Sequence, residues 1–591
     1  MRKFVSYFLI GWSLLSCSTG EKNDGVIRYE QVQLTASEKQ TLKESLAAFH
    51  PDFDPAEAMI TSKLNGWNYH TDALTGNFHQ VRGSFNYAVM LLDMGDEQYL
   101  ERALKIIEKT ISLQDQDLTS KSCGVWPYFM EEPLATKKAP IDYNWADFNA
   151  VSLLEVWMGH SAQLPERLKE KIKQSLILAA KSIQKRNVGS DYTNIAIMGT
   201  YVTYVTSQLF DLPEMKEYAR KRLQRFYDYT LDKGGFSEYN SPTYTITALD
   251  ELNRMERHIV EPAARKMIDS LYSIGWDMIA RHYHPPTGQW TGPHSRAYTS
   301  LVNRNFYSIL KEASNGQIVA GIGQPRSDVK IKHHIPGYLI HYFLTPEYPR
   351  TEVNVFEKVE PGIVGTTYLT DKFALSTANR SGLWNQRRPF LVYWGDAQSP
   401  KYLQVRFLHD DYDFSSASFY SQQKENKALA IIGFITNGGD KHINIDRLKD
   451  GKFKAKDLRL RFEFGNILTP EVLITPKKPN EPFTITLDQL KFNLQLYCAD
   501  FDHKKGRWEK GGNGKASWID YVFYADKERE FDLTKIERAI AGFTFSIVPS
   551  DKNQAIEKVE ISESGDLLKA SWSSLKIELP LKPQTPKNPF F

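Results

Sequence analysis

Hydrophobic residues recur at a helical period in the part of the chain that precedes about residue 350. In the segment 96–114, the apolar positions i, i+4, i+7 and i+11 fall on one face of a helix; they are Leu100, Leu104, Ile107 and Ile111. Three further segments share this amphipathic pattern and open with Pro or acidic residues, as helix N-termini prefer; they cover 164–186, 212–231 and 261–283. The pattern predicts four helices that each expose one face to solvent.

A second and more apolar helical segment precedes each of these amphipathic helices. These apolar segments begin near residues 85, 146, 194 and 243, and a spacing of about 50 residues indicates a repeated helical hairpin. Each hairpin then has one buried helix and one amphipathic helix. We predict that residues 41–345 form an incomplete ring of such hairpins, an α/α toroid, with the apolar helices on its inside.

The hydrophobic period changes to two after about residue 355. Runs of β-branched and aromatic residues alternate there with turns rich in Gly, Asn, Asp and Pro; examples are 402–408, 429–436, 458–465 and 542–549. Successive strands without helices between them favour an antiparallel β-sandwich, which we predict over 355–591. The segment 344–354 is the predicted hinge. The expected fold class is therefore multidomain, α then β, as the length of 591 residues also suggests.

The first residues follow the order of a bacterial secretory signal. A positively charged start at 1–3 precedes the apolar run 4–15, which is too short to span a bilayer. The sequence Leu-Leu-Ser-Cys that ends at Cys17 resembles the lipobox of bacterial lipoproteins, which implies cleavage before Cys17 and attachment of lipid to it. We expect a signal peptide over 1–17, a tether over 18–40, and a lipid-anchored protein of the cell envelope that touches the membrane only through its lipid. The alternative is an ordinary secretory signal.

Composition narrows the possible partners. A net charge of +3 with 25% charged residues creates no field that would attract nucleic acid, so we expect no nucleic-acid partner. Aromatic residues make up 13% of the chain, and Trp and Tyr suit sugar rings, although core packing is their commoner role. Cys123 and Cys498 are far apart and no Cys/His cluster has metal-ligand spacing. We expect a monomer with no disulfide, no metal and no cofactor.

In a ring of hairpins, the connections from each outer helix to the next inner helix lie at one end and converge on one cleft. Polar and aromatic residues concentrate in these connections, whereas those at the opposite end, such as 93–98 and 210–215, are short and plain. This asymmetry predicts a site at one end of the ring. The candidate residues in the five connections are His79 and Arg82; Trp126, Glu131, Glu132, Trp145, Asp147 and Asn149; Asn194; Glu238, Tyr239, Asn240 and Tyr244; and Trp290, His294, Arg296 and Tyr298.

Several candidates also have a purely structural explanation. Asn149 and Asn194 stand where helix N-caps are expected. Asn240 would shape a turn. Tryptophans such as Trp126 and Trp145 pack in a core more often than they bind a sugar. The combination of residues in one cleft therefore carries more weight than any single member.

The layout resembles the toroid-plus-β-sandwich polysaccharide lyases, the heparinase II/III-like and chondroitin-lyase group. In that group an Asn comes from one loop, a His and a Tyr from the next, and an Arg from the one after; Asn194, Tyr244 and Arg296 match this order. The expected His is missing from the fourth connection, whose sequence is GGFSEYNSPTYT. His294 or His79 is the candidate replacement. In the fifth connection, GPHSRAY, the His, Arg and Tyr alternate, so an extended backbone would turn all three to one side.

The resemblance implies β-elimination on a uronic-acid-containing polysaccharide. A lyase removes the C5 proton and expels the C4 oxygen after the neighbouring carboxylate has been neutralised, and each donor aimed at the developing enolate contributes about 3–4 kcal/mol. On this hypothesis Asn194 holds the carboxylate and Tyr244 transfers the proton. Arg296 supplies the cation that lowers a tyrosine pKa, with His294 and Tyr298 nearby. The other candidates would contact a polysaccharide or oligosaccharide of anionic character.

Two other functions stay open at this point. Toroids also host glycoside hydrolases, whose two carboxylates are about 5 Å apart for retention or about 6.5–9.5 Å for inversion. Asp147 and Glu238 would form that pair, with Glu131 or Glu132 in reserve. A glycan-binding lipoprotein without catalysis is the third possibility, since an aromatic cleft suffices for binding.

Overall fold

The structure is a computed structural model, and it describes residues 22–23, 26–27, 29 and 32–585, apart from 327, 441, 443–444, 446–447, 477, 505 and 553–556. The predicted signal peptide and the predicted lipidation site Cys17 lie outside the described residues. Within these ranges, no helix combines the length and the apolar character needed to cross a membrane. Helix α1 (Ala36–Phe49) begins inside the segment that the sequence predicts as a tether.

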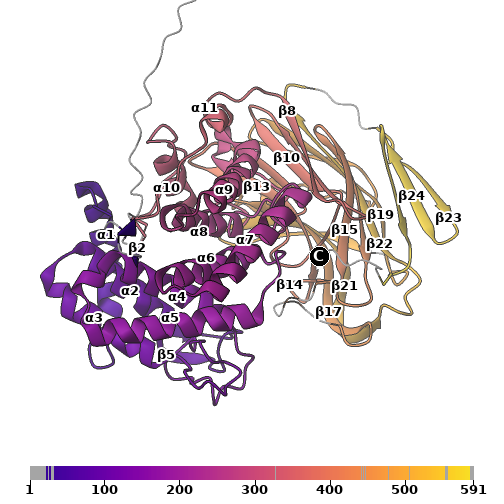
Figure 1. Cartoon of the computed structure of the whole chain (residues 1–591). Coiled ribbons are helices and arrows are strands. Elements are labelled where there is room, and N and C mark those ends of the chain that lie inside the picture. Colours follow the sequence, from indigo (N-terminus) through magenta and orange to yellow (C-terminus); the bar gives the residue numbers. More distant parts are fainter. Residues whose placement is uncertain are drawn as a thin grey trace, which may run out of the picture.

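Four helical hairpins form the N-terminal half of the chain (Figure 1). The inner helices α2, α4, α6 and α8 pack against one another in chain order. Two short helices follow, α10 (Arg304–Ala313) and α11 (His341–Leu344). The hairpins pair α2 (Val81–Met94) with α3 (Glu97–Ser112), α4 (Asn144–His160) with α5 (Glu166–Arg186), α6 (Thr193–Leu209) with α7 (Pro213–Lys233), and α8 (Tyr244–His258) with α9 (Pro262–His282).

Burial separates the inner helices from the outer ones. In α6 every residue from Thr193 to Ser207 is buried, whereas α7 buries one stripe that includes Met215, Ala219 and Leu223. The α/α toroid expected from the sequence is therefore confirmed, with its apolar helices inside. The segment 303–331 and helix α1 complete the wall of a central cavity, since both line it together with α2, α4 and α8.

The connection before α2 contains strands that the sequence analysis did not predict. A small antiparallel sheet joins β3 (Phe53–Asp54), β4 (Met59–Asn65) and β5 (Thr75–Gln80) at the end of the ring where the inner helices begin. The fourth connection begins where α7 ends, because Gly234 adopts a left-handed conformation at φ +78° and stops the helix. Tyr244 is the first residue of the helix that follows.

The C-terminal half is an antiparallel β-sandwich, as the period-two pattern predicts (Figure 1). Its first strand begins at Arg350, inside the predicted hinge. One sheet has the order β20 (Arg507–Gly512), β21 (Ala516–Asp532), β17 (Lys452–Gly465), β13 (Pro400–His409), β12 (Phe390–Gly395), β10 (Phe373–Ala378), β9 (Ile363–Leu369) and β8 (Arg350–Glu357), with β14 (Tyr412–Asp413) beside β13. The second has the order β11 (Arg380–Gly382), β15 (Ala417–Lys424), β16 (Lys427–Phe434), β22 (Ala539–Pro549), β19 (Leu490–Phe501) and β18 (Phe483–Leu487).

Phenylalanine side chains fill the space between the two sheets. Phe390 of β12 meets Phe545 of β22 with ring centroids 5.2 Å apart, and Phe462 of β17 meets Phe543 of β22 at 5.1 Å. A third sheet, made of β23 (Glu560–Ser564), β24 (Leu567–Trp572) and β25 (Leu575–Pro580), packs through β25 against β15 and β16. The sandwich thus has a rigid apolar core of its own.

Backbone hydrogen bonds join the sandwich to the fifth connection of the toroid. The amides of His294 and Arg388 each donate to the carbonyl of the other residue at 3.0 Å, and the amide of Ala297 donates to the Gln386 carbonyl at 2.8 Å. On the other side of the same segment, Ser295 N–H donates to the carbonyl of Tyr239 at 3.2 Å. Residues 294–297 are therefore held between the fourth connection and the sandwich.

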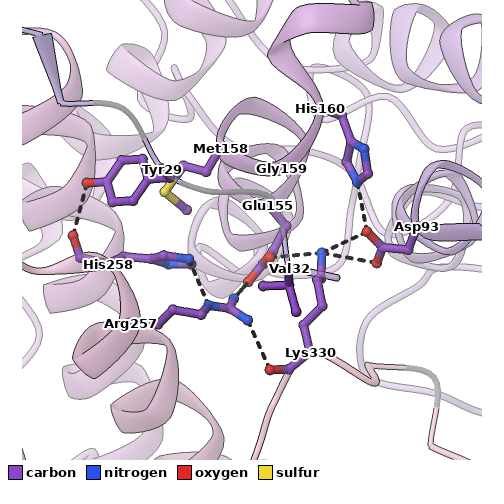
Figure 2. Close-up of a pocket in the computed structure, with 10 residues that line it drawn as sticks. All are labelled: Tyr29, Val32, Asp93, Glu155, Met158, Gly159, His160, Arg257, His258 and Lys330. Carbon is purple, nitrogen blue, oxygen red and sulfur yellow. Dashed lines mark hydrogen bonds and ion pairs between the residues drawn. The ribbon is translucent and has the colours of Figure 1, made fainter. Parts of the chain in front are cut away.

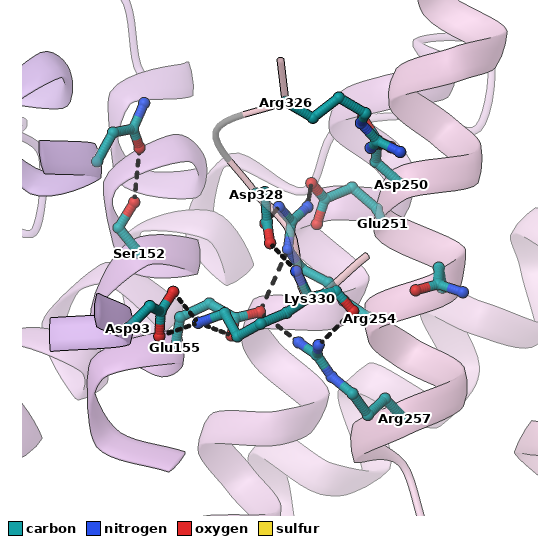
Figure 3. Close-up of polar contacts among 12 residues, drawn as sticks. Asp93, Ser152, Glu155, Asp250, Glu251, Arg254, Arg257, Arg326, Asp328 and Lys330 are labelled. Atoms are coloured by element: carbon teal, nitrogen blue, oxygen red, sulfur yellow. Dashed lines mark hydrogen bonds and ion pairs between the residues drawn. The ribbon is translucent and has the colours of Figure 1, made fainter. Parts of the chain in front are cut away.

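Buried ion pairs tie the far ends of the inner helices together. Lys330 Nζ lies 3.0 Å from Asp93 Oδ2 on α2 and 2.9 Å from Glu155 Oε2 on α4 (Figure 2). Arg257 of α8 pairs with the second oxygen of Glu155 at 2.7 Å. Figure 3 shows how the same network continues to Arg254 and the segment around residue 328. These bonds link three inner helices to the chain that closes the ring.

Replacement of Lys330 by Met is expected to destabilise the protein by about 3–5 kcal/mol, because it leaves the buried carboxylates of Asp93 and Glu155 without a shared cation. Urea denaturation followed by far-ultraviolet circular dichroism at pH 7 measures the change. The matched control is Lys105→Met, which removes an exposed i,i+4 pair with Glu101 and should change stability by less than about 0.5 kcal/mol. Equal stability of the two variants would contradict this role of the network.

Candidate active site

Asn240 fixes the shape of the fourth connection. It adopts a left-handed conformation at φ +44°, and its side-chain amide donates to the carbonyls of Thr291 at 2.8 Å and Pro293 at 3.0 Å. Its amide oxygen accepts the indole N–H of Trp290 at 2.5 Å. Asn240 and Trp290 are both buried. Their role is to lock the fourth connection onto the fifth, so the sequence-based expectation that they contact substrate is wrong for this structure.

His294 is also part of this scaffold. Its Nδ1 atom lies 2.6 Å from the carbonyl oxygen of Asn240, and the side chain is buried. Burial lowers the pKa of His294 to about 3, although the bond to Asn240 acts in the opposite direction. The alternating pattern in GPHSRAY therefore does not bring all three side chains to one place. His294 is a neutral structural residue, and the hypothesis that it replaces the missing catalytic histidine is not supported.

Arg296, Tyr244 and Tyr298 form one hydrogen-bonded cluster. Arg296 Nη2 donates to the Tyr244 hydroxyl at 3.0 Å, and the hydroxyls of Tyr244 and Tyr298 are 2.8 Å apart. The guanidinium carbon lies 4.8 Å from the centroid of the Tyr244 ring. Tyr298 is 58% exposed, which leaves this end of the cluster open to a ligand. Burial raises the pKa of Tyr244 above its usual range even though Arg296 acts to lower it.

Glu238 and Asn194 meet at the start of α6. The backbone amide of Glu238 donates to the Thr193 hydroxyl at 3.3 Å, and its carboxylate is hydrogen-bonded by the backbone of Asn194 and approached by Arg296 Nη1 at 3.4 Å. Burial raises the pKa of Glu238 to about 7, against the lowering effect of Arg296. Within the described chain, Glu238 Oε2 and Asn194 Oδ1 are buried without a hydrogen-bond partner. A ligand that supplies the missing hydrogen bonds is one explanation of such atoms.

The N-cap explanation for the two asparagines is wrong. Asn194 is the second residue of α6 and its side chain caps no helix, while the N-cap position belongs to Tyr192. Asn149 lies one turn inside α4, fully buried, and among the described residues neither atom of its side-chain amide has a hydrogen-bond partner. Asn194 belongs to the cluster through Glu238, whereas Asn149 is enclosed in the ring wall.

The sandwich supplies part of the site. Arg296 Nε donates to Gln386 Oε1 at 2.7 Å, and the guanidinium carbon lies 5.2 Å from the centroid of the Trp384 ring. The Trp384 ring in turn stacks on His442 with centroids 4.9 Å apart. Sequence reasoning missed these three residues, because nothing in a period-two pattern indicates which strand end will face the toroid.

Tyr69 and Tyr192 add aromatic surface from the first and third connections. Burial raises the pKa of Tyr69, and Asp142 acts in the same direction. Tyr192 accepts a hydrogen bond from Asn144 at 3.1 Å. Burial raises the pKa of Tyr192, and Glu238 acts in the same direction. Both tyrosines lie within connections that the sequence analysis singled out. Their aromatic side chains were the sequence feature that could have identified them as candidate site residues.

Sequence and structure comparisons agree with this architecture. A family model described as a domain of unknown function, DUF8769, matches residues 40–334, which is the helical part. No curated protein matches the chain. The solved structure of heparinase III superposes with a TM-score of 0.50 and 10% identity, over 95% of this chain and 94% of that one. The chain shares the fold of heparinase III.

Two further lyase structures superpose less well. The chondroitin AC lyase of Streptomyces coelicolor A3, solved with chondroitin sulphate, gives a TM-score of 0.45 at 9% identity over 91% of this chain and 83% of that one. The heparan sulfate lyase HepC from Pedobacter heparinus gives 0.38 at 10% identity over 93% and 90%. At these identities the likeness to heparinase III establishes the fold, and the chemistry has to be argued from the residues.

Within this heparinase III fold, several predicted sugar contacts are core residues. Trp126 is fully buried and its indole donates to the Thr110 carbonyl at 3.0 Å. Tyr239 stacks on Phe356 of β8 with centroids 4.0 Å apart and planes 8° apart, so it seals the domain junction. Trp145 is buried, and its ring centroid lies 5.1 Å from that of His70. The His70 ring in turn contacts the Tyr69 ring, with centroids 3.8 Å apart. Trp145 thus supports the aromatic wall from behind.

Asp147 is not placed for chemistry with Glu238. It is 2% exposed and packs against Gly199 of α6. The fit is tight, because a Cβ atom added to Gly199 would lie only 2.7 Å from Asp147 Oδ1 and 2.8 Å from Arg222 Nη2. Burial raises the pKa of Asp147 to about 7, with Arg222 as the main opposing charge. A carboxylate enclosed between helices cannot approach a sugar, so the carboxylate pair proposed for a hydrolase is not presented to substrate.

The first connection contributes neither histidine nor arginine to the cluster. His79 Nδ1 lies 2.5 Å from Glu131 Oε1, and its Nε2 lies 3.1 Å from Asp54 Oδ2. Burial acts to lower the pKa of His79, but the two carboxylates outweigh it and raise this pKa. Glu132 accepts the backbone amide of Asp72 at 2.8 Å. Arg82 lines the central cavity of the ring. In the described chain, no group of three His, Cys, Asp or Glu side chains is arranged to hold a metal ion.

Proposed function

We propose that this protein is a polysaccharide lyase that cleaves a uronic-acid-containing, anionic glycan by β-elimination. The observation that carries the proposal is the position of the Tyr244 hydroxyl, which is held between Arg296 at 3.0 Å and the exposed Tyr298 at 2.8 Å. A tyrosine anchored by a guanidinium and open on one side is suited to move a proton to and from a bound sugar. The fold of heparinase III is consistent with this chemistry.

In the proposed reaction Tyr244 carries one proton. Its phenolate takes the proton from C5 of the uronate, the electron pair of the broken C–H bond forms a double bond between C4 and C5, and the C4–O4 bond breaks. The Tyr244 phenol then returns the proton to the departing O4. Arg296 stabilises the phenolate through its hydrogen bond to the Tyr244 hydroxyl, which offsets part of the effect of burial on the pKa of Tyr244.

Asn194 and Glu238 are proposed to neutralise the substrate carboxylate. Asn194 would donate through its side-chain N–H groups at the start of α6, where the helix dipole favours negative charge, and Glu238 would donate through its protonated carboxyl, which has one buried oxygen without a partner. With a pKa of about 7, Glu238 is largely protonated in mildly acidic solution, and a second carboxylate beside it raises that pKa further. The protonated acid therefore donates a hydrogen bond to the substrate and stabilises the enolate that follows C5 deprotonation.

Lipid attachment at Cys17 and a place in the bacterial cell envelope remain proposals that the sequence Leu-Leu-Ser-Cys supports. Incorporation of a labelled fatty acid into the protein in bacterial cells, and its loss in Cys17→Ser, is the expected result. Equal labelling of both forms would contradict the anchor. Secretion without any label would favour an ordinary signal peptide.

Removal of the Tyr244 hydroxyl should abolish most of the activity. The mature protein is incubated with a panel of uronate-containing glycans while ultraviolet absorbance and new reducing ends are followed together. We expect both signals from the wild type, a loss of about 10³-fold in Tyr244→Phe and of about 10²-fold to 10³-fold in Arg296→Gln. The control is Tyr229→Phe, which removes a hydroxyl on α7 that lies outside the cluster and, among the described residues, donates to Ser237 Oγ at 3.4 Å.

Each alternative function predicts a different outcome of the same assay. New reducing ends without the absorbance of an unsaturated uronate would indicate hydrolysis and overturn the lyase proposal. Glycan binding with neither signal would indicate a binding protein without catalysis.

The pH dependence of kcat/KM tests the role of Glu238. The reaction needs neutral Glu238 and ionised Tyr244, so below about pH 7 the rate should rise about tenfold per pH unit as the phenolate fraction grows. Above pH 7 the loss of neutral Glu238 cancels this gain and the profile becomes flat. In Glu238→Gln the side chain stays neutral, and the rise should continue beyond pH 7. A profile with the same break in both proteins would exclude Glu238 from this role.

A further inference from the structure

The proposed reaction does not use the central cavity of the ring. Its volume is about 810 Å³, and its wall comes from α1, the inner helices and the segment 303–331. This volume lies within the range of pockets that hold small organic ligands. Apolar walls formed by Phe148, Met90 and Met198 alternate with polar groups.

Most charged groups around this cavity are paired with each other. Arg254 binds Glu251 at 2.5 Å and Asp328 at 2.5 Å. Arg326 binds Asp250 and Glu312, both at 3.1 Å. Figure 3 shows Arg254 and Arg326 beside Asp250, Glu251 and Asp328. Each of these cations is thus neutralised by carboxylates of the protein itself.

Arg82 differs from these cations. Its guanidinium carbon lies 4.0 Å from the centroid of the Phe148 ring, and among the described residues no carboxylate and no hydrogen-bond acceptor pairs with it. The residue is exposed although it belongs to an inner helix, because its side chain faces the cavity. Surrounding protein lowers the pKa of Arg82, with Glu251 acting in the opposite direction. Without a carboxylate partner among the described residues, this exposed guanidinium can bind an anion that enters the cavity.

Neutral hydrogen-bonding groups stand in the same cavity. Ser152 Oγ donates to Asn86 Oδ1 at 3.2 Å, which leaves the amide N–H groups of Asn86 for a ligand. Asn305 lines the cavity, and its side chain has no hydrogen bond within the described chain. Glu251 has one buried oxygen without a partner. These groups match the hydroxyls of a sugar, and Met90 and Met198 add apolar surface to the cavity wall.

We propose that the central cavity of the toroid is a second ligand site, which binds a small sugar acid, a uronate monosaccharide or disaccharide, with its carboxylate on Arg82. A guanidinium binds a carboxylate through two parallel hydrogen bonds, and the Arg82 guanidinium carbon lies 4.0 Å from the centroid of the Phe148 ring. None of the residues assigned to the Tyr244 cluster is among the described residues that line this cavity. It would bind its ligand whether or not the protein is a lyase.

Calorimetric titration of the mature Tyr244→Phe protein with glucuronate and with a uronate disaccharide tests this site without turnover. We expect saturable binding, weakened at least about tenfold by Arg82→Gln and unchanged by Arg102→Gln. Arg102 is a matched control because its guanidinium also lies over a ring, that of Phe53 at 4.8 Å, but outside the cavity. Glucose, which has no carboxylate, and acetate, which has no ring, should both bind at least about tenfold more weakly than glucuronate.

Two further comparisons separate this site from the catalytic cluster. Binding should persist in Arg296→Gln, and Asn86→Leu, a second change inside the cavity, should weaken it even if Arg82→Gln fails to fold. Arg82-dependent binding by a protein without lyase activity would support the cavity site while the proposed function fails. Absence of uronate binding, equal binding by Arg82→Gln, or loss of binding in Arg296→Gln alone would overturn the second site.

Discussion

The backbone of residues 294–297 is the element on which the rest of the candidate site depends. It pairs on one side with Gln386 and Arg388 of the sandwich and on the other with Tyr239 of the fourth connection. Hydrogen bonds on both edges leave this segment little freedom, so the Arg296 side chain is delivered to one position between the two domains. Arg296 then contacts Tyr244, Glu238 and Gln386 at once. A site built in this way needs both domains, because neither half of the chain contains all of these groups.

Stability and chemistry are separated within the toroid. At the far ends of the inner helices, carboxylates and cations are matched, as around Lys330 and Glu155. At the near ends, Glu238 and Asn194 keep buried polar atoms without partners. An unfilled buried acceptor costs about 1–3 kcal/mol, which a fold retains where a ligand can fill it. The apolar core of the inner helices provides the stability against which such a cost is small.

The same contrast recurs inside the ring. Arg254 and Arg326 are neutralised by neighbouring carboxylates. The Arg82 guanidinium lies over the Phe148 ring instead, and among the described residues it has no carboxylate partner. The difference follows from position, since Arg82 is in the first turn of α2 and the acidic residues cluster nearer the other end of the helices. Groups without partners in the protein thus occur both near the junction with the sandwich and in the central cavity.

The sequence by itself determined the order of the elements. In the first half of the chain, hydrophobic residues repeat at a helical period of 3.6, and apolar helices alternate with amphipathic ones. In the second half they repeat at a period of two. These patterns were enough to predict the toroid and the sandwich, because the period of hydrophobic residues shows which side of a helix or strand is buried. The sequence also indicated that Tyr244, Asn194 and Arg296 lie at the same end of the ring. Only the tertiary structure decided that His294, Trp290 and Trp126 are buried and that Gln386 and Trp384 reach the cluster. A pattern along one element cannot state which distant element covers it, and the burial of a loop residue depends entirely on that neighbour.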